Sequence, residues 1–136
     1  MKKLHHVFLS QTRQKFGAKV EKLKQLYIGA CNDEALFHGQ PAKVYRKCGK
    51  SNCKCVEGGD SRHGPYDIIR VYREGKNTQV TVADDEKHFV EMAKRYQHEV
   101  SRRKEIVTLQ EEMLSMLDEI VDKRTIWMKE ELKRDE

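Results

Sequence analysis

The stretch that decides how the middle of this chain folds is Tyr45–Tyr66, which reads YRKCGKSNCKCVEGGDSRHGPY. It holds three of the chain's four cysteines, Cys48, Cys53 and Cys55, followed by His63, in the spacing C-x4-C-x-C-x7-H. Structural zinc sites use four tetrahedral nitrogen or sulfur ligands, and this set supplies three thiolates and one imidazole. An extended segment through the last two cysteines would point both thiols to the same side. The spacing therefore predicts a structural zinc site.

Other roles for the cysteines stay open at the level of sequence. Cys31 could replace His63 as the fourth ligand, or could be a small buried hydrophobic residue. The thiols could also be ordinary reduced cysteines, a disulfide pair in an exported protein, or a redox switch at Cys53 and Cys55. A metal ion has a second argument in its favour, because a module with so few apolar residues seldom folds unaided.

The central segment resembles the core of an uncharacterised family of short prokaryotic and phage proteins. That core reads approximately Cys-Gly-Lys-x-x-Cys-x-Cys, then His-Gly-Pro-Tyr, then a hairpin with Gly-Lys. The matching residues here begin at Cys48 and His63 and end at Gly75-Lys76. The resemblance implies that the cysteines and the histidine act as one unit, and that the protein is associated with a mobile element or phage. The family has no established activity to carry over.

Two β-branched stretches follow the cysteine segment. Asp67–Arg73 (DIIRVYR) and Thr78–Val82 (TQVTV) flank a turn at Gly75. Alternation places Ile69 and Val71 on one face, with the valines of the second stretch available opposite them. The pattern predicts a β-hairpin.

Apolar residues at helical spacing predict a helix on each side of this module. The first is Leu9–Ala30, followed by a short helical turn at Asp33–Phe37. The second begins after a cap at Thr81 or Asp84 and would reach about Glu130. The stripe of the first helix comprises Leu9, Phe16, Val20, Leu23, Tyr27 and Ala30. The seven-residue seam of the second comprises Phe89, Ala93, Tyr96, Val100, Val107, Leu114, Leu117 and Val121.

These elements predict an α+β fold in which two long amphipathic helices, as a coiled-coil-like hairpin or an oligomer, flank a small zinc-stabilised β-hairpin module. Residues 1–40 would hold the N-terminal helix and helical turn, 41–83 the Cys/His zinc-binding β module, and 84–136 the long coiled-coil-like helix. Neither helix can bury its stripe alone. We therefore expect the helices to pair with each other or with a second copy, so a homodimer is one expected assembly.

Positive charge is concentrated in the first two thirds of the chain. Residues 41–82 carry nine Lys and Arg against four Asp and Glu, whereas residues 83–136 carry eleven against fifteen. Basic side chains neutralise phosphates, and tyrosine rings can stack on unpaired bases. We expect a nucleic-acid-binding surface, with DNA as the favoured ligand. Its expected members are Arg46, Lys47, Lys50, Lys54, Arg62, Arg70 and Arg73.

Alternative interpretations of these features remain. The basic segment could be a solvated loop whose tyrosines, Tyr45, Tyr66 and Tyr72, fill a small β core, and Arg102-Arg103-Lys104 could extend the basic track. A second candidate function is a protein-binding accessory or inhibitor that docks through its helices on a nucleic-acid-processing complex. Trp127, in an apolar patch late in the second helix, would then contact the partner.

The sequence disfavours several classes of protein. It contains no phosphate-binding loop, dinucleotide glycine fingerprint, serine nucleophile elbow or HExxH motif, so we expect no catalytic residues. No run approaches the roughly 18 consecutive apolar residues of a membrane span, and the N-terminus has no apolar signal core. We therefore expect a cytoplasmic protein with no membrane contact.

Overall fold

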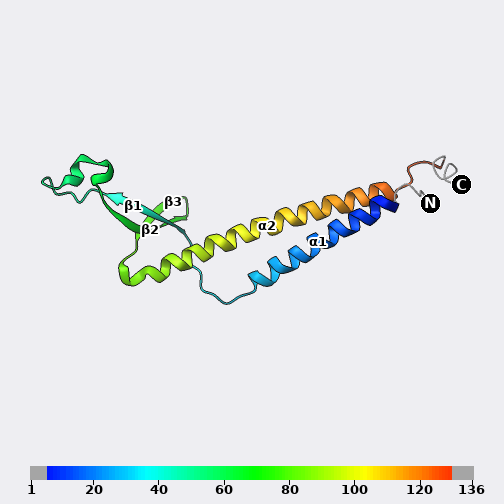
Figure 1. The fold of residues 1–136 in the computed structure, drawn as a ribbon, viewed down its shortest axis with the longest axis horizontal. Helices are drawn as coiled ribbons and strands as arrows, with labels where there is room; N and C mark the ends of the chain where they lie inside the picture. Colours follow the sequence, from blue (N-terminus) through cyan, green and yellow to red (C-terminus); the bar gives the residue numbers. More distant parts are fainter. Residues whose placement is uncertain (1–5, 130–136) are drawn as a thin grey trace. The chain divides into compact units, whose positions relative to one another are not determined.

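The computed structural model describes residues 6–129, which form two α-helices and one three-stranded antiparallel sheet (Figure 1). The described chain divides into two compact units. One unit contains α1 and the part of α2 that begins at Arg102, and the other is Asp33–Ser101. The elements are α1 (His6–Ala30), β1 (Gln40–Arg46), η2 (Lys54–Glu57), η3 (Gly59–Ser61), β2 (His63–Arg73), β3 (Lys76–Thr81), η4 (Asp84–Glu86) and α2 (Lys87–Arg124).

The predicted architecture of two long helices flanking a β-hairpin is wrong. The arrangement is α+β, but α1 has 25 residues and α2 has 38, and the sheet has three strands in the order β1-β2-β3. The hairpin prediction missed β1, because QPAKVYR contains Pro41 and only a short apolar run. Proline cannot donate to a sheet ladder and is tolerated at an edge, which is where β1 lies.

The central strand β2 holds the core of the sheet. Ile68 and Ile69 are neighbours on β2 with side chains on opposite faces, and both are almost completely buried. Ile69 lies opposite Val80 of β3 and packs with Val82 and with Ala93 of α2. Phe37, Val71, Phe89 and Val90 complete this cluster. The sheet is therefore anchored on the first turns of α2.

The segment between α1 and β1 is not the short helical turn expected at Asp33–Phe37. Residues 31–37 have no regular secondary structure. The Phe37 N–H donates to the carbonyl of Met92 at 3.2 Å, and its ring lies 5.4 Å from that of Phe89, edge to face. Contacts with α2 therefore override the weak local preference for helix.

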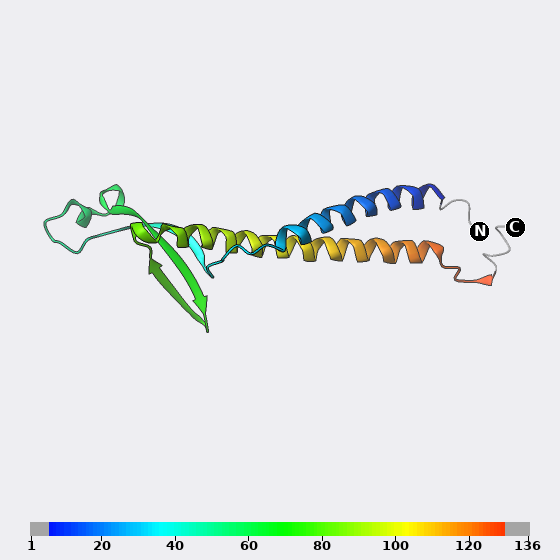
Figure 2. The same cartoon turned by 90° about the horizontal axis from the view of Figure 1, so that it is seen from below.

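Helix α1 and the last part of α2 run antiparallel, side by side (Figure 2). Lys22 forms an ion pair with Glu105 at 3.0 Å, and Lys19 forms one with Glu112 at 2.7 Å. The partner numbers rise along α2 as they fall along α1, as they must in an antiparallel pair. Helix α1 itself begins three residues before the predicted Leu9 and ends where predicted.

The stripes that pack between these helices match the predicted ones only in part, because Leu9, Phe16 and Leu23 of α1 were predicted and the packed residues of α2 were not. On α2 the less exposed residues are Ile106, Leu109, Met113, Met116 and Ile120, in 3, 4, 3, 4 spacing. On α1 they are Leu9, Thr12, Phe16, Lys19, Leu23 and Leu26. Predicted seam residues such as Val20, Leu114 and Val121 are exposed. Each helix carries adjacent stripes that both satisfy a heptad, and only the packing decides between them.

The second helix is shorter than predicted. It ends at Arg124, so Trp127 lies beyond it in a non-helical segment. None of the helices in the described part of the chain has the length and apolar character needed to cross a bilayer.

Candidate metal centre and the surface around it

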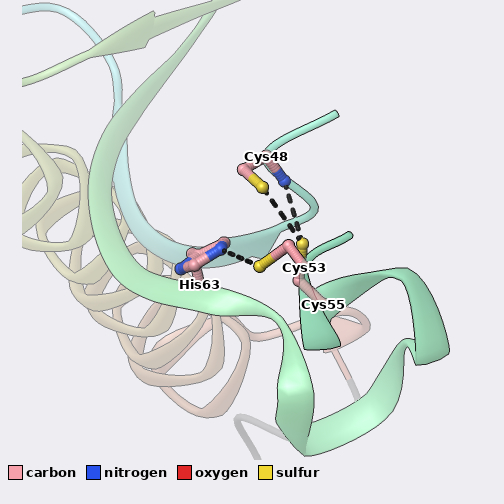
Figure 3. Close-up of side chains that lie close together, drawn as sticks. All are labelled: Cys48, Cys53, Cys55 and His63. Carbon is pink, nitrogen blue, oxygen red and sulfur yellow. Dashed lines mark hydrogen bonds between the residues drawn. The ribbon is translucent and has the colours of Figure 1, made fainter. Parts of the chain in front are cut away.

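Four side chains converge at the end of the β1-β2 ladder (Figure 3). The ligand atoms of Cys48, Cys53, Cys55 and His63 all lie within 4.8 Å of one another. The Sγ atoms of Cys48 and Cys55 are 3.4 Å apart, and the Sγ of Cys53 is 3.2 Å from the Nε2 of His63. Tetrahedral zinc–sulfur and zinc–nitrogen bonds place ligand atoms about 3.5–3.8 Å apart. The four groups can therefore hold one metal ion.

The register of the sheet brings the histidine to the first cysteine. His63 begins β2 and pairs with Arg46 at the end of β1, so Cys48, two residues further on, lies at the same end of the ladder. Gly64 makes this approach sterically possible. Its φ is +135°, and a Cβ there would lie 2.7 Å from the carbonyl oxygen of Val44. Any larger residue would push β1 and β2 apart at this point.

Tight turns bring the other two cysteines to the cluster. The Cys53 N–H donates to the carbonyl of Lys50 at 3.3 Å, which closes the loop between the first two cysteines. The expectation of an extended strand through Cys53 and Cys55 is wrong, because η2 begins at Lys54. Cys53 itself is extended and Cys55 lies inside the 3-10 turn, yet both thiols reach the cluster.

The thiols of the cluster have divergent acidities. The pKa of Cys48 is lowered to about 6, first by the backbone N–H of Lys50 and then by the Cys55 thiol. At Cys55 the N–H of Cys48 acts to lower the pKa, but burial and the neighbouring thiols outweigh it and raise the pKa. Adjacent thiols resist joint ionisation unless a cation is present. Three sulfurs and one imidazole at these distances therefore fit a metal ion that prefers soft ligands.

The three cysteines of the cluster differ in burial, which increases from the first to the last along the chain. Cys55 is fully buried, Cys53 is half-buried and Cys48 is exposed. All four cysteines are free thiols. Cys31 is exposed at the end of α1, so its alternative interpretation as a buried hydrophobic residue is wrong, and the fourth member of the cluster is His63.

The seven basic residues expected to bind nucleic acid are all exposed. Arg46 donates to the hydroxyl of Thr81 at 3.2 Å, and Arg62 donates to the carbonyl of Gly59 at 3.1 Å. Within residues 6–129, none of the seven forms an ion pair. They are Arg46, Lys47, Lys50, Lys54, Arg62, Arg70 and Arg73.

Two other lysines of the same unit are neutralised. Lys43 and Lys87 both approach Asp67, and the ion pair with Lys43 measures 3.5 Å. The pKa of Asp67 is lowered, first by the hydrogen bond from Lys87 and also by the charge of Lys43. The seven basic residues thus differ from these two lysines in having no acidic partner in the part of the chain that the structure describes.

Tyr45, Tyr66 and Tyr72 do not fill a β core, so that alternative interpretation is wrong. Tyr45 and Tyr66 are exposed, and Tyr72 is 64% exposed. The basic run Arg102-Arg103-Lys104 lies on α2 within the helical pair. The guanidinium of Arg102 lies against Gly29, whereas Arg103 and Lys104 are exposed. Trp127 is 73% exposed.

The unit Asp33–Ser101 has a second feature that no sequence pattern predicted. A cleft of about 620 Å³ lies between the sheet and α2, with Arg70, Tyr72, Gln79, Tyr96 and Gln97 among its lining residues. These residues come from three separate elements. Their spacing along the chain carries no signal of a shared site.

A family model described as "Domain of unknown function (DUF6788)" matches residues 11–91, which is more than half of the chain. The chain therefore belongs to this family. The matched region contains most of α1, the whole sheet, the Cys/His cluster and the start of α2. No curated protein and no solved structure matches the chain significantly.

Proposed function

We propose that this member of the DUF6788 family is a small nucleic-acid-binding protein, with DNA as the favoured ligand, in which Cys48, Cys53, Cys55 and His63 hold a structural zinc ion. The association with a phage or mobile element that the central motif implies is part of the proposal. We do not assign a catalytic residue.

Zinc is the metal that the donor set favours. Thiolate ligands select soft or borderline metals over magnesium and calcium, and a complete set of four protein ligands is typical of a structural site. When bound, zinc would cross-link the loop of residues 47–62 to the sheet. This loop needs such a cross-link, because Cys55 is its one buried residue. The cross-linked loop would then hold its basic side chains in a defined arrangement.

The observation that carries nucleic-acid binding is that none of the seven exposed basic residues forms an ion pair with another residue of the described range 6–129. Lys43 and Lys87 of the same unit are paired with Asp67, so its carboxylates neutralise some of its basic residues but, within the described part of the chain, none of the seven. Unneutralised cations at an ordered surface attract polyanions and release their counterions on binding. Affinity for duplex DNA should fall by about 0.9 log units per log unit of salt for each phosphate neutralised.

The test is fluorescence anisotropy with labelled duplex and single-stranded oligonucleotides at several salt concentrations. The double variant Lys50→Glu/Arg73→Glu changes two of the unpaired residues. We expect it to weaken binding at low salt at least tenfold and to reduce the salt slope by about two. Zinc content and circular dichroism verify that the variant is folded.

The matched control is Lys15→Glu/Lys24→Glu, which makes the same change in net charge at exposed positions of α1. It should bind almost as tightly as the wild type. Equal loss of binding in the two variants would show that net charge alone attracts the oligonucleotide, and no binding of the zinc-loaded wild type at low salt would refute the proposal.

A second function is favoured by the apolar side chains that remain exposed on the helical pair. These side chains are large, and that of Leu114, for example, is 61% exposed. Val20, Ile28, Val107, Leu117 and Val121 are exposed as well. We propose as the alternative a protein-binding accessory that docks through α1 and α2, with Trp127 at the contact, or a homodimer formed through the same helices.

The two functions respond to different substitutions. Trp127→Ala should leave oligonucleotide binding unchanged under the first function. Under the alternative, sedimentation of the wild type should show a dimer or a stable complex that Trp127→Ala or Leu114→Lys disrupts, while Lys50→Glu/Arg73→Glu leaves it intact. A monomeric wild type that binds DNA would rule out the homodimer.

A further inference from the structure

The two sides of the helical pair differ in chemistry. Successive residues of an α-helix are about 100° apart, so residues that follow the packed positions of α1 and α2 lie on one side of the pair, and residues that precede them lie on the other. Two contacts agree with this arrangement. Lys22 and Glu105 each precede a packed residue and form an ion pair at 3.0 Å, whereas Tyr27 and Gln110 each follow one and share a hydrogen bond.

The side of the pair that holds Tyr27 and Gln110 is rich in exposed apolar residues, and we call it the apolar face. On α2 the residues that precede packed positions are three glutamates, a threonine and a serine, but those that follow are mostly leucine and valine. Six large apolar side chains of this face are at least 40% exposed. They are Val20 and Tyr27 of α1 and Val107, Leu114, Leu117 and Val121 of α2. Contiguous apolar patches of this kind mark interaction sites.

A groove between the two helices opens on the apolar face. Its volume is about 280 Å³, and its lining consists of four apolar residues and two arginines. They are Leu9, Arg13, Phe16, Leu117, Ile120 and Arg124. Leu9, Phe16 and Ile120 belong to the packed stripes, yet they are only half-buried. The groove is therefore a part of the helix–helix core that no described residue covers.

The charges on the apolar face are basic. None of the residues that follow a packed position is acidic, and Arg13 and Lys24 are the charged ones on α1. The side chains of Arg13 and Arg124 form no hydrogen bond or ion pair with another described residue. The face thus offers unneutralised guanidinium groups beside an apolar groove. A complementary ligand carries carboxylates next to apolar groups.

We propose that the apolar face binds an acidic amphipathic helix of a partner protein, whose apolar stripe enters the groove and whose carboxylates lie beside Arg13 and Arg124. Val107–Val121 spans about 21 Å at 1.5 Å per residue, which matches a partner helix of roughly four turns. A third helix laid against an antiparallel pair would cover its half-buried core. The inference rests on the alternative function rather than on nucleic-acid binding, and it gives that function a site and a class of partner.

Other occupants fit the apolar face less well. A second copy of this chain would bring three further cations to a face that already carries Arg13, Lys24 and Arg124. A polynucleotide has no apolar stripe to fill the groove, and a membrane surface does not project into a concave site. An acidic amphipathic helix supplies both the carboxylates and the projecting apolar side chains.

The experiment measures the binding of two labelled peptides to the zinc-loaded full chain by fluorescence anisotropy. Both peptides form helices of the same length with leucine at the same heptad positions, and the flanking positions are glutamate in one and lysine in the other. We expect the glutamate peptide to bind the wild type about tenfold more tightly. Because the whole chain carries a net charge of +5, variants of equal charge are needed to locate this preference.

Arg13→Glu and Lys15→Glu make the same change in charge two residues apart. Arg13 lies on the apolar face, whereas Lys15 precedes a packed residue and is exposed on the opposite side. Arg13→Glu should weaken binding of the glutamate peptide about tenfold and strengthen binding of the lysine peptide, and Lys15→Glu should change neither by more than about twofold. Leu117→Gln should weaken binding of both peptides, with Ala18→Gln on the opposite side as its control. Circular dichroism verifies that the helices persist.

The outcomes separate this inference from the proposed function. Equal effects of Arg13→Glu and Lys15→Glu, or equal affinities of the two peptides, would overturn the inference. A wild type that sediments as a dimer, and that Leu117→Gln dissociates, would assign the face to a second copy and overturn it as well. Lys50→Glu/Arg73→Glu should keep the peptide bound. Failure of oligonucleotides alone would therefore refute only nucleic-acid binding, and failure of the glutamate peptide alone would overturn only this inference.

Discussion

The helical pair and the Cys/His end of the sheet are stabilised in opposite ways. Between α1 and α2, apolar side chains recur every three or four residues over several turns, so no single residue is indispensable. In residues 47–62, by contrast, Cys55 is the one buried side chain, and order depends on four ligand atoms within 4.8 Å. A repeated apolar contact is tolerant of change, whereas a single cross-link is not. We therefore expect substitutions in the two regions to differ in their effect.

The largest effect is expected from Cys55→Ser. The substitution removes the buried ligand, so we expect loss of zinc and loss of order around residues 47–62, while the helical signal of α1 and α2 persists. Zinc binding contributes about 10–16 kcal/mol in small zinc modules at neutral pH. Elemental analysis and NMR spectra measure both results. Cys31→Ser, outside the cluster, is the control and should keep one zinc ion per chain; full zinc retention in Cys55→Ser would contradict the cross-link.

A smaller effect is expected from Leu109→Ala in the helical pair. Leu109 is 5% exposed, and truncation of a buried leucine costs about 2–5 kcal/mol. Leu114→Ala, five residues away and exposed, should cost less than about 1 kcal/mol in a monomer. Urea unfolding followed by circular dichroism gives both values. Equal losses in the free energy of unfolding would show that Leu114 is buried in solution, as expected in the homodimer of the alternative function.

Two glycine substitutions should change stability in opposite directions. Gly64→Ala places a Cβ 2.7 Å from the Val44 carbonyl at φ +135°, so we expect a loss of about 1–3 kcal/mol and weaker zinc binding. Gly17→Ala meets no atom within 4 Å in the middle of α1 and should stabilise the helix by up to about 1 kcal/mol. Thermal unfolding and zinc competition with a chelator measure these changes. A neutral Gly64→Ala would show that the ladder tolerates a wider separation next to His63.

The smallest effect is a pH-dependent one at Glu112. The hydrogen bond and charge of Lys19 lower the pKa of Glu112 in the folded state. Its contribution to stability is therefore present above the ordinary glutamate pKa of about 4.3 and is lost as the pH falls through the lower folded value. Glu112→Gln should unfold at a lower temperature than the wild type at pH 7, and the difference should disappear in acid. Glu111→Gln, at the neighbouring exposed position, should show no such difference at either pH.

Part of the fold could be predicted from local sequence patterns. Helix α1, strands β2 and β3 and the start of α2 follow from short-range periodicity, because each needs only neighbouring residues to define it. The ligand spacing also indicated a common site for Cys48, Cys53, Cys55 and His63. The reason given for Cys53 and Cys55 was nevertheless wrong, since a 3-10 turn rather than a strand carries Cys55 to the cluster.

Local patterns are therefore enough to predict the elements with strong periodicity and the donor set of the candidate metal centre. Four features arise only in the folded chain: the third strand β1, the irregular path through Asp33–Phe37, the choice between adjacent heptad stripes, and the cleft that Arg70 and Tyr72 help to line. The physical reason is common to these four. Each depends on a partner distant in the chain, such as β2 for β1 or Met92 for Phe37, and the free energy of those contacts exceeds the local preferences that a sequence pattern records.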